Sequence, residues 1–404
     1  MRTADPNRWG QLVVGMVGQG AGTVFANAAA FLIPYLHLVE GVPLAQAGAL
    51  ASAPLLGTTV SLVLWGVVVD RVGERASLTL GLGIVTAAAV GAAFTDGYIA
   101  LAAMFFLGGV GVASTNSASG RLVVGWFPPH RRGTAMGIRQ TAMPLGVGAA
   151  ALVVPTLVER TDLRTTMLVV AVLCLAGTLA CALVVVDPPR APRAEAADLG
   201  QLVNPYRAST DPERRLLRIH VSSALLVVPQ FTVWTYMLVW LVDSRSWTAA
   251  AAGGLVAVSQ VLGAAGRIGA GWWSDAVASR MRPMRTIALG AALSMLALGL
   301  LESTVLGIAI MIVAMVVTVA DNGLAFTSVA ETGGPYWSGK ALGVQNTGQY
   351  LVSAAVPPAV GLLVAAQGYG VAFAVVGLFP LLAVPLIPTR PPTGDGAARY
   401  PTGQ

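Results

Sequence analysis

Long apolar stretches, separated by short polar segments, follow one another along the whole chain. A membrane-spanning helix needs roughly 20 apolar residues. The stretches are apolar on all sides, whereas the strands of a membrane β-barrel alternate apolar and polar residues. The pattern therefore predicts an all-α integral membrane protein with twelve transmembrane helices. The predicted spans lie near residues 11–38, 46–69, 77–95, 98–125, 134–158, 163–186, 217–241, 248–273, 285–302, 304–330, 340–366 and 369–388.

Short sequence patterns occur twice, about 205 residues apart. The segment from Gly66 to Asp70, at the end of the second span, matches the segment from Gly271 to Asp275 at the end of the eighth, an offset of 271 − 66 = 205. Segments 133–141 and 339–347 also match, with an offset of 339 − 133 = 206. Repeated halves in a membrane chain are typical of secondary transporters. We therefore predict two pseudo-symmetric six-helix bundles, 1–189 and 217–390, a cytoplasmic linker, 190–216, and a disordered cytoplasmic tail, 391–404.

Composition and charge agree with a membrane location. The chain of 404 residues is 55% hydrophobic and 10% charged, against about 25% charged residues in a soluble domain. The net charge of +6 comes from Lys and Arg in alternate loops, which by the positive-inside rule places both termini in the cytoplasm. We expect a multi-pass protein of a bacterial-type inner (plasma) membrane, with the lipid bilayer and not nucleic acid as its partner. Cys174 and Cys181 are interpreted as packing residues, and the sequence suggests no metal site and no cofactor.

The loop after the second span carries the strongest local motif. Gly66, Asp70, Arg71, Gly73 and Arg75 form a glycine-punctuated basic turn. An aspartate there can accept hydrogen bonds from the start of a neighbouring helix, which carries partial positive charge. We predict a latch that favours one state of a gate, repeated in weaker form at Gly271 and Asp275. The alternative interpretation is an ordinary basic loop.

With this loop and twelve spans in two halves, the whole chain resembles the major facilitator superfamily, and the resemblance implies the fold of that family. Residues 126–133, Trp-Phe-Pro-Pro-His-Arg-Arg-Gly, are similar to the family's loop between helices 4 and 5. The chain departs from some members in two places. Phe105 occupies the position of an arginine found in many proton-coupled members, and Met143-Pro144 replaces the Gly-Pro pair of many drug antiporters.

Charges inside predicted spans are costly and usually face a cavity or a partner. Arg267 precedes Asp275 by eight residues, about 12 Å along a helix. Its surroundings, Gly266-Arg267-Ile268 and then Ser274-Asp275, resemble the eighth helix of oxalate/formate-type and monocarboxylate transporters, where the resemblance implies contact with a carboxylate. A guanidinium group matches a carboxylate with two parallel hydrogen bonds. A structural ion pair with Asp321 is the alternative. The lysine deep in helix 11 of the oxalate-type families is missing, because Lys340 stands at the start of that span.

A second polar group lies in the fifth span at Arg139 and Gln140, and its repeat partners are Gln345 and Asn346. We expect these residues to contact substrate, although Arg139 could instead extend to the cytoplasmic face. Asp321 and Asn322 in the tenth span are candidates for ion pairing or for binding a coupling ion. Further candidate lining residues are Asn27, Tyr35, Asn116, Gln230 and Trp234.

These observations lead to one functional hypothesis and its alternatives. We expect a secondary active transporter, not an enzyme, that moves a small organic anion, a carboxylate, by alternating access, with proton symport as one mode of coupling. The expected partners are the bilayer, the anionic substrate and protons, and the expected assembly is a monomer. A proton-coupled exporter of drugs or metabolites is the alternative within transport. A ligand sensor would need a larger soluble domain, and a membrane enzyme would need paired catalytic groups.

Overall fold

The computed structural model describes residues 7–207, 211 and 213–389. These residues form α-helices and no strand. Eleven of the helical stretches in this part of the chain are long and apolar enough to cross a membrane. The longest, Ser338–Ala383, has 46 residues and contains Gly368 at φ 82°, ψ 172°, a non-helical conformation that divides it into two stretches. The twelve predicted spans are thereby accounted for, and the boundary expected between 366 and 369 falls at this glycine.

The chain divides into two compact units, and neither of them is continuous in sequence. Unit 1 comprises Met1–Phe127, Thr141–Asp198 and Gly333–Thr347, and unit 2 comprises Pro128–Gln140, Leu199–Thr332 and Gly348–Gln404. Each unit therefore takes one short segment from the half of the sequence that otherwise builds the other unit. The predicted tail, 391–404, lies outside the described residues.

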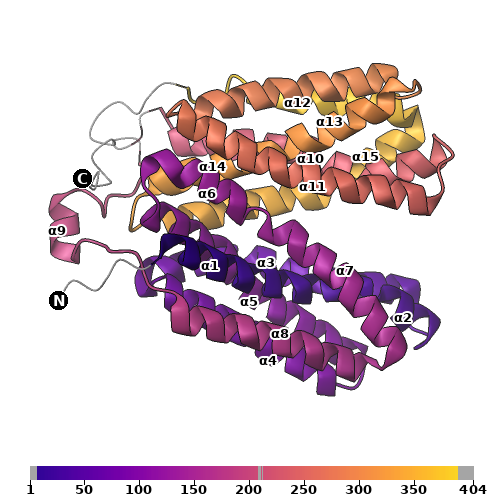
Figure 1. The fold of residues 1–404 in the computed structure, drawn as a ribbon, viewed down its shortest axis with the longest axis horizontal. Coiled ribbons are helices and arrows are strands. Elements are labelled where there is room, and N and C mark those ends of the chain that lie inside the picture. Colours follow the sequence, from indigo (N-terminus) through magenta and orange to yellow (C-terminus); the bar gives the residue numbers. More distant parts are fainter. Residues whose placement is uncertain (1–6, 208–210, 212, 390–404) are drawn as a thin grey trace. The chain divides into compact units, whose positions relative to one another are not determined.

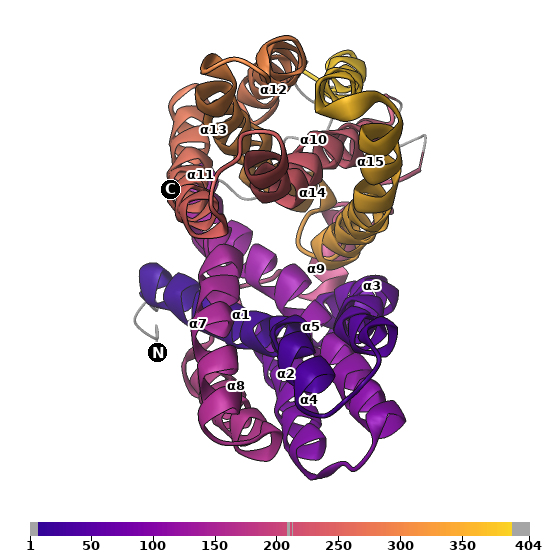
Figure 2. The ribbon, with the colours of Figure 1, turned by 90° about the vertical axis from the view of Figure 1, so that its right-hand side faces the viewer.

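Unit 1 is a bundle of membrane-length helices in which α4 lies beside both α5 and α8 (Figures 1 and 2). Asn7 caps the start of α1, and Asp162 caps α8 by accepting a 2.6 Å hydrogen bond from the Thr165 N–H. Glycine allows close approach of the helices: a Cβ added to Gly109 of α5 would meet the backbone of Pro54 in α3. The helices are α1 (Arg8–Phe31), α2 (Ile33–Leu38), α3 (Leu44–Val72), α4 (Glu74–Phe94), α5 (Tyr98–Trp126), α7 (Ala142–Arg160), α8 (Leu163–Val184), the short α9 (Arg193–Asp198), and the first residues of α15 (Ser338–Ala383).

Unit 2 places α13 beside both α11 and α12, as Figures 1 and 2 show. Its buried core is rich in methionine and aromatic side chains, among them Met237, Trp240 and Phe373. The helices are α6 (Pro129–Arg139), α10 (Arg215–Asp243), α11 (Ala249–Ala276), α12 (Met281–Leu301), α13 (Leu306–Ala320), α14 (Asn322–Gly333) and the remainder of α15.

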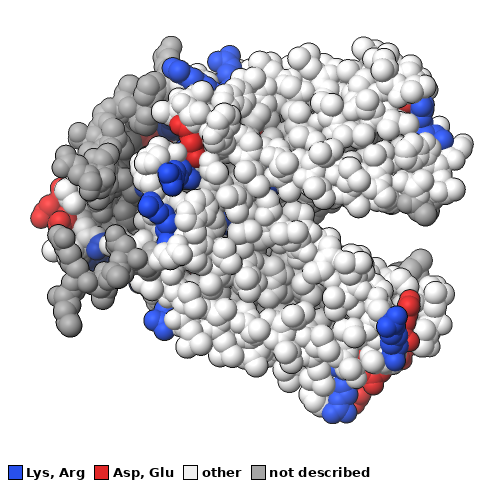
Figure 3. Space-filling model, viewed as in Figure 1, with Lys and Arg blue, Asp and Glu red and all other residues white. Residues whose placement is uncertain are grey.

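Charged side chains gather at the ends of the helices, and the helix flanks seen in Figure 3 are nearly free of Lys, Arg, Asp and Glu. Many exposed side chains are leucine and valine, such as Leu293 and Leu300 of α12. Exposed apolar flanks with charged ends are what a bilayer requires of its protein surface.

Candidate functional site

Two of the predicted membrane spans are interrupted, and the interruptions fall at polar residues within them. The predicted fifth span breaks into α6 and α7 at Gln140 and Thr141, directly after Arg139. The predicted tenth span breaks into α13 and α14 at Asp321, directly before Asn322. Gln140, Thr141 and Asp321 keep right-handed helical backbone angles, so each break is a local irregularity within one stretch of membrane length. Neither break was expected from the sequence.

Arg139 ends α6 and is buried, with 2% of its surface exposed. Its Nη1 donates a 2.8 Å hydrogen bond to Oε1 of Gln140, and its guanidinium carbon lies 6.0 Å from the ring centre of Phe326 in α14. Tyr350 of α15 also interacts with it electrostatically. The alternative that Arg139 reaches to the cytoplasmic face is therefore wrong, because Phe326 and Gln140 hold its guanidinium inside unit 2.

Arg267 lies in α11 and is 3% exposed. Close packing fixes its backbone against α6: a Cβ added to Gly137 would lie 2.5 Å from the carbonyl oxygen of Arg267 and 2.9 Å from Cα of Ile268. Gly323 of α14 approaches the same glycine from another side, since its added Cβ would lie 3.5 Å from the Gly137 nitrogen. The two helix breaks and Arg267 therefore meet around Gly137.

The second helix break is tied to α10. Asn322 donates a 3.0 Å hydrogen bond from Nδ2 to Oε1 of Gln230, and both side chains are buried. Asp321, beside it, is 2% exposed and interacts electrostatically with Arg267. Trp234 stands one turn after Gln230 on α10, and its indole Nε1 is buried without a hydrogen-bond partner among the described residues. These contacts place Gln230, Asp321 and Asn322 in one polar group.

Two buried cations and one buried acid lie in this part of unit 2. Arg139 and Arg267 carry positive charges, and Asp321 carries a negative charge when it is ionised. Each charge costs about 2.5–3.5 kcal/mol to place at the centre of a membrane helix, so an anion beside the arginines would offset part of this cost. In addition, Nη1 of Arg267 is buried with no hydrogen-bond partner among the residues that the structure describes. A buried donor without an acceptor lowers the stability of a protein by about 1–3 kcal/mol, and by more if the donor is charged. A ligand or a water molecule that accepts the hydrogen bond removes this cost.

The remaining predicted lining residues belong to unit 1. Asn27 is half-buried on α1 and donates to the Thr23 carbonyl oxygen, while Tyr35 on α2 donates a 2.9 Å hydrogen bond to Glu40. Asn116 is half-buried on α5. Gln345 and Asn346 lie near the start of α15, where they are 2% and 4% exposed. The structure therefore joins the unit 2 candidates into one group, and the unit 1 candidates stay predictions.

The motif at the end of α3 forms a buried charge network in unit 1. Asp70 accepts hydrogen bonds of 2.8 and 2.9 Å from the backbone N–H groups of Gly339 and Lys340, the first residues of α15. We call this contact the Asp70 cap. Arg121 lies 3.3 Å from Asp70 and 3.0 Å from Glu74, and Arg190 forms a 2.9 Å ion pair with Glu74. Arg121 is 5% exposed, so its guanidinium lies inside unit 1 and does not extend to solvent.

The repeated motif forms the equivalent network in unit 2. Asp275 accepts hydrogen bonds of 2.9 and 2.8 Å from the N–H groups of Gly133 and Thr134 near the start of α6. We call this contact the Asp275 cap. Arg280 bonds Asp275 at 2.5 Å and lies 3.3 Å from Glu331. Burial lowers the pKa of Arg280, but the carboxylates of Glu331 and Asp275 outweigh burial and raise that pKa above its usual value.

The glycines of the two motifs allow backbones to cross. A Cβ added to Gly66 would meet the backbone of Gly339, and one added to Gly271 would meet the backbone of Gly133. Gly73, at φ 97°, ends α3 and begins α4, in a region of backbone conformation that glycine adopts readily. Arg75 donates from Nε to the Ala182 carbonyl oxygen, and Arg71 is exposed after Asp70.

Sequence reasoning missed several partners in these networks. Asp187 accepts 2.7 Å hydrogen bonds from the N–H groups of both Glu74 and Arg75, and so caps α4 from 112 and 113 residues away. Glu331, which also lies 3.5 Å from Arg132, and Phe326 beside Arg139 were missed as well. The available signals were weak: Asp187 is an acid directly after an apolar span, and Glu331 is an acid at the end of another.

Comparisons with known proteins agree with this architecture. The family model of the Major Facilitator Superfamily matches residues 12–357. An uncharacterized MFS-type transporter of Mycobacterium tuberculosis (strain ATCC 25618 / H37Rv) is 46% identical over 396 residues, which cover 97% of this chain and 88% of the relative. The hexuronate transporter of Bacillus subtilis (strain 168) is 21% identical over 262 residues, 62% of this chain and 60% of that protein.

Two solved structures show the same fold. The proton:xylose symporter XylE bound to 6-bromo-6-deoxy-D-glucose has a TM-score of 0.72 at 18% identity, covering 93% of this chain and 94% of that one. The human organic anion transporter MFSD10 has a TM-score of 0.71 at 17% identity, covering 95% and 100%. The predicted fold class is confirmed, and the chain belongs to the Major Facilitator Superfamily of membrane transporters.

Proposed function

We propose that this transporter moves a small organic anion with a carboxylate group, and that Arg267 binds that carboxylate. The observation that carries the proposal is the buried Nη1 of Arg267, which has no hydrogen-bond partner among the described residues. A substrate carboxylate would supply the missing acceptor, and it would also offset the positive charge of the arginines.

The neighbouring residues would contribute to substrate binding in different ways. Arg139 is already held by Gln140 and Phe326, so its main contribution is charge. Gln230 and Asn322 are bonded to each other and offer their remaining amide groups to substrate hydroxyls. A hydroxylated acid would use both sets of groups. The likeness to a hexuronate transporter supports this substrate class, since a hexuronate is a sugar that carries a carboxylate.

The position of Asp321 supports proton coupling as part of this proposal. Asp321 and the substrate carboxylate would both interact with Arg267, so the two negative charges compete for it. Protonation of Asp321 removes the competitor and strengthens anion binding, and by reciprocity the anion strengthens proton binding. A proton and an anion would then cross together. The family's alternating access between the two faces of the membrane would release them on the other side.

Uptake into proteoliposomes tests the role of Arg267. Labelled glucuronate, a set of smaller carboxylates and the neutral sugar xylose are offered to wild type, Arg267→Gln and Arg267→Lys. The control is Arg282→Gln, an exposed arginine on α12. Loss of a charged hydrogen bond of about 1.5–3 kcal/mol predicts a 10- to 100-fold fall in carboxylate uptake for Arg267→Gln. Arg267→Lys should lose less, and Arg282→Gln should transport normally.

The result that contradicts the proposal is equal carboxylate uptake by Arg267→Gln and wild type, or uptake of xylose alone. A melting curve for each variant separates a folding defect from a binding defect. Direct binding of glucuronate to the folded Arg267→Gln protein gives the same answer without transport.

A pH gradient tests the role of Asp321. In Asp321→Asn the competition for Arg267 is gone, so anion exchange between the two sides should continue, but an imposed pH gradient should no longer drive accumulation. The measurement is counterflow of labelled anion beside gradient-driven uptake in the same vesicles. Accumulation that survives in Asp321→Asn would assign coupling to another residue.

A further inference from the structure

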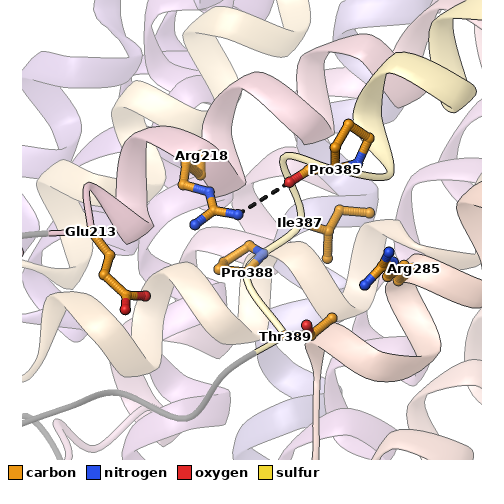
Figure 4. A pocket seen from close by; sticks show the side chains of 7 residues that line it. All are labelled: Glu213, Arg218, Arg285, Pro385, Ile387, Pro388 and Thr389. Atoms are coloured by element: carbon orange, nitrogen blue, oxygen red, sulfur yellow. Dashed lines mark hydrogen bonds between the residues drawn. The ribbon is translucent and has the colours of Figure 1, made fainter.

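A pocket away from the helix breaks lies where the ends of three membrane helices of unit 2 meet. It has a volume of about 420 Å³. Arg218 comes from the first turn of α10, and Arg285 comes from the second turn of α12. The segment 385–389, directly after α15, runs between them, as Figure 4 shows. All three elements are ends of apolar spans, so the pocket lies at the depth of lipid headgroups when the helices span a bilayer.

The two arginines are held differently. Arg218 donates from Nη2 to the Pro385 carbonyl oxygen at 3.1 Å (Figure 4) and from Nε to the Leu386 carbonyl oxygen at 3.0 Å, so its guanidinium is fixed in place. Arg285 is exposed and lines the other side of the pocket. Glu213 is the acidic residue of the lining. The lining charge is therefore 2 − 1 = +1, with one fixed and one adjustable cation.

An apolar strip continues from the pocket along α12. Leu289 and Leu293 follow Arg285 at intervals of four residues and are 41% and 65% exposed. Residues spaced in this way share one face of a helix, and the eight residues from Arg285 to Leu293 extend about 12 Å. On α10, Leu217 and Val221 flank Arg218 and are also exposed. A cationic pocket on helices that also carry exposed apolar residues matches a ligand with an anionic head and a hydrocarbon chain.

We propose that this pocket binds the headgroup phosphate of an anionic phospholipid, with an acyl chain on the strip formed by Leu289 and Leu293. The phosphate accepts from Arg285 and from the free side of the Arg218 guanidinium. A free phosphate compound has the same headgroup chemistry, but it would gain nothing from the apolar strip. The lipid would link α10, α12 and the end of α15, and so stabilise unit 2. The proposal does not depend on the transported substrate.

The test measures lipid retained by the purified full chain. Native mass spectrometry counts bound phosphatidylglycerol, and thermal melting is followed with phosphatidylglycerol, phosphatidylcholine or inorganic phosphate added to detergent solution. The variants are Arg285→Gln and Glu213→Gln. Arg282→Gln is the matched control, because Arg282 is an exposed arginine in the first turn of the same helix and does not line the pocket.

One basic residue near a membrane surface contributes enough attraction to change affinity about fivefold. Arg285→Gln should therefore weaken phosphatidylglycerol binding about fivefold and reduce the lipid-dependent rise in melting temperature. Arg282→Gln should change neither, and Glu213→Gln should strengthen binding. Equal effects of Arg285→Gln and Arg282→Gln would overturn the proposal, as would equal stabilisation by inorganic phosphate or by phosphatidylcholine. Loss of glucuronate uptake in Arg267→Gln leaves this result unaffected, so the two proposals fail separately.

Discussion

At the scale of single residues, Gly137 determines how closely Arg267 approaches the end of α6. A methyl group on Gly137 would meet the Arg267 carbonyl oxygen at 2.5 Å, so α6 must move away from α11. Overpacking of this kind costs about 1–3 kcal/mol. We expect Gly137→Ala to melt at a lower temperature and to transport more slowly, because Arg139 and Arg267 are displaced together.

Gly269→Ala is the matched control for this prediction. Gly269 lies two residues after Arg267 on the same helix, and an added Cβ there meets nothing within 4 Å. Alanine favours a helix over glycine by up to about 1 kcal/mol, so this variant should melt at the same or a higher temperature. Melting and uptake are measured on both proteins. Indistinguishable behaviour of the two alanine variants would show that the contact at Gly137 has no such role.

The sequence showed which single residues are chemically unusual, but it did not show which residues they contact. Arg139, Arg267 and Asp321 could be selected because a charge within an apolar span is costly wherever it faces. Their partners could not be selected. Phe326 looks like any aromatic residue of a membrane helix, and the contact of Asp187 with Glu74 joins residues 113 positions apart. Such contacts depend on the packing of helices, which a single sequence does not contain.

At the scale of elements, each cap holds the start of one helix. The Asp70 cap bonds the first residues of α15, and the Asp275 cap bonds Gly133 and Thr134 of α6. An asparagine has no charge and one acceptor oxygen, so it loses part of each contact, about 1.5 kcal/mol. Asp275→Asn should therefore raise hydrogen exchange about tenfold at Gly133 and Thr134, while exchange at Gly339 and Lys340 stays unchanged.

Asp70→Asn should give the reverse pattern, with faster exchange at Gly339 and Lys340 and no change in α6. Hydrogen–deuterium exchange with mass spectrometry on both variants makes each one the control for the other. The same increase at both helices in either variant would mean that the two caps form a single cooperative gate. No increase in either would mean that these carboxylates do not hold the helix starts.

The elements themselves were only partly predictable. The spans at 134–158 and 304–330 were expected as single helices, because their apolar character continues through Gln140 and Asp321. The structure interrupts the regular helix locally in both of them, within one stretch of membrane length each. The first break has a local cause, because Pro144 lacks the N–H that would bond the carbonyl oxygen of Gln140 four residues earlier. At Asp321 no proline lies within four residues on either side, so the second break had no such signal. The break between the last two spans was predictable, because Gly368 stands between apolar runs.

At the scale of the whole molecule, the placement of basic residues predicts which loops face the cytoplasm. Arg280, Arg282 and Arg285 follow α11, whereas the turn after α12 holds Glu302, Ser303 and Thr304. The positive-inside rule therefore places the first turn in the cytoplasm and the second on the opposite face. With an even number of spans, the same rule predicts that both termini lie on the cytoplasmic side.

Cysteine labelling in intact cells tests this orientation. Val277 and Ser303 are exposed, one after α11 and the other after α12. A membrane-impermeant maleimide should label Ser303→Cys in intact cells, but it should label Val277→Cys only after the cells are permeabilised. The native Cys174 and Cys181 are buried, and burial raises the cost of forming the reactive thiolate, so the background should be low. Labelling of Val277→Cys in intact cells would show that the topology is the reverse of the predicted one. The pocket lined by Arg218 and Arg285 would then face the lipids of the outer leaflet.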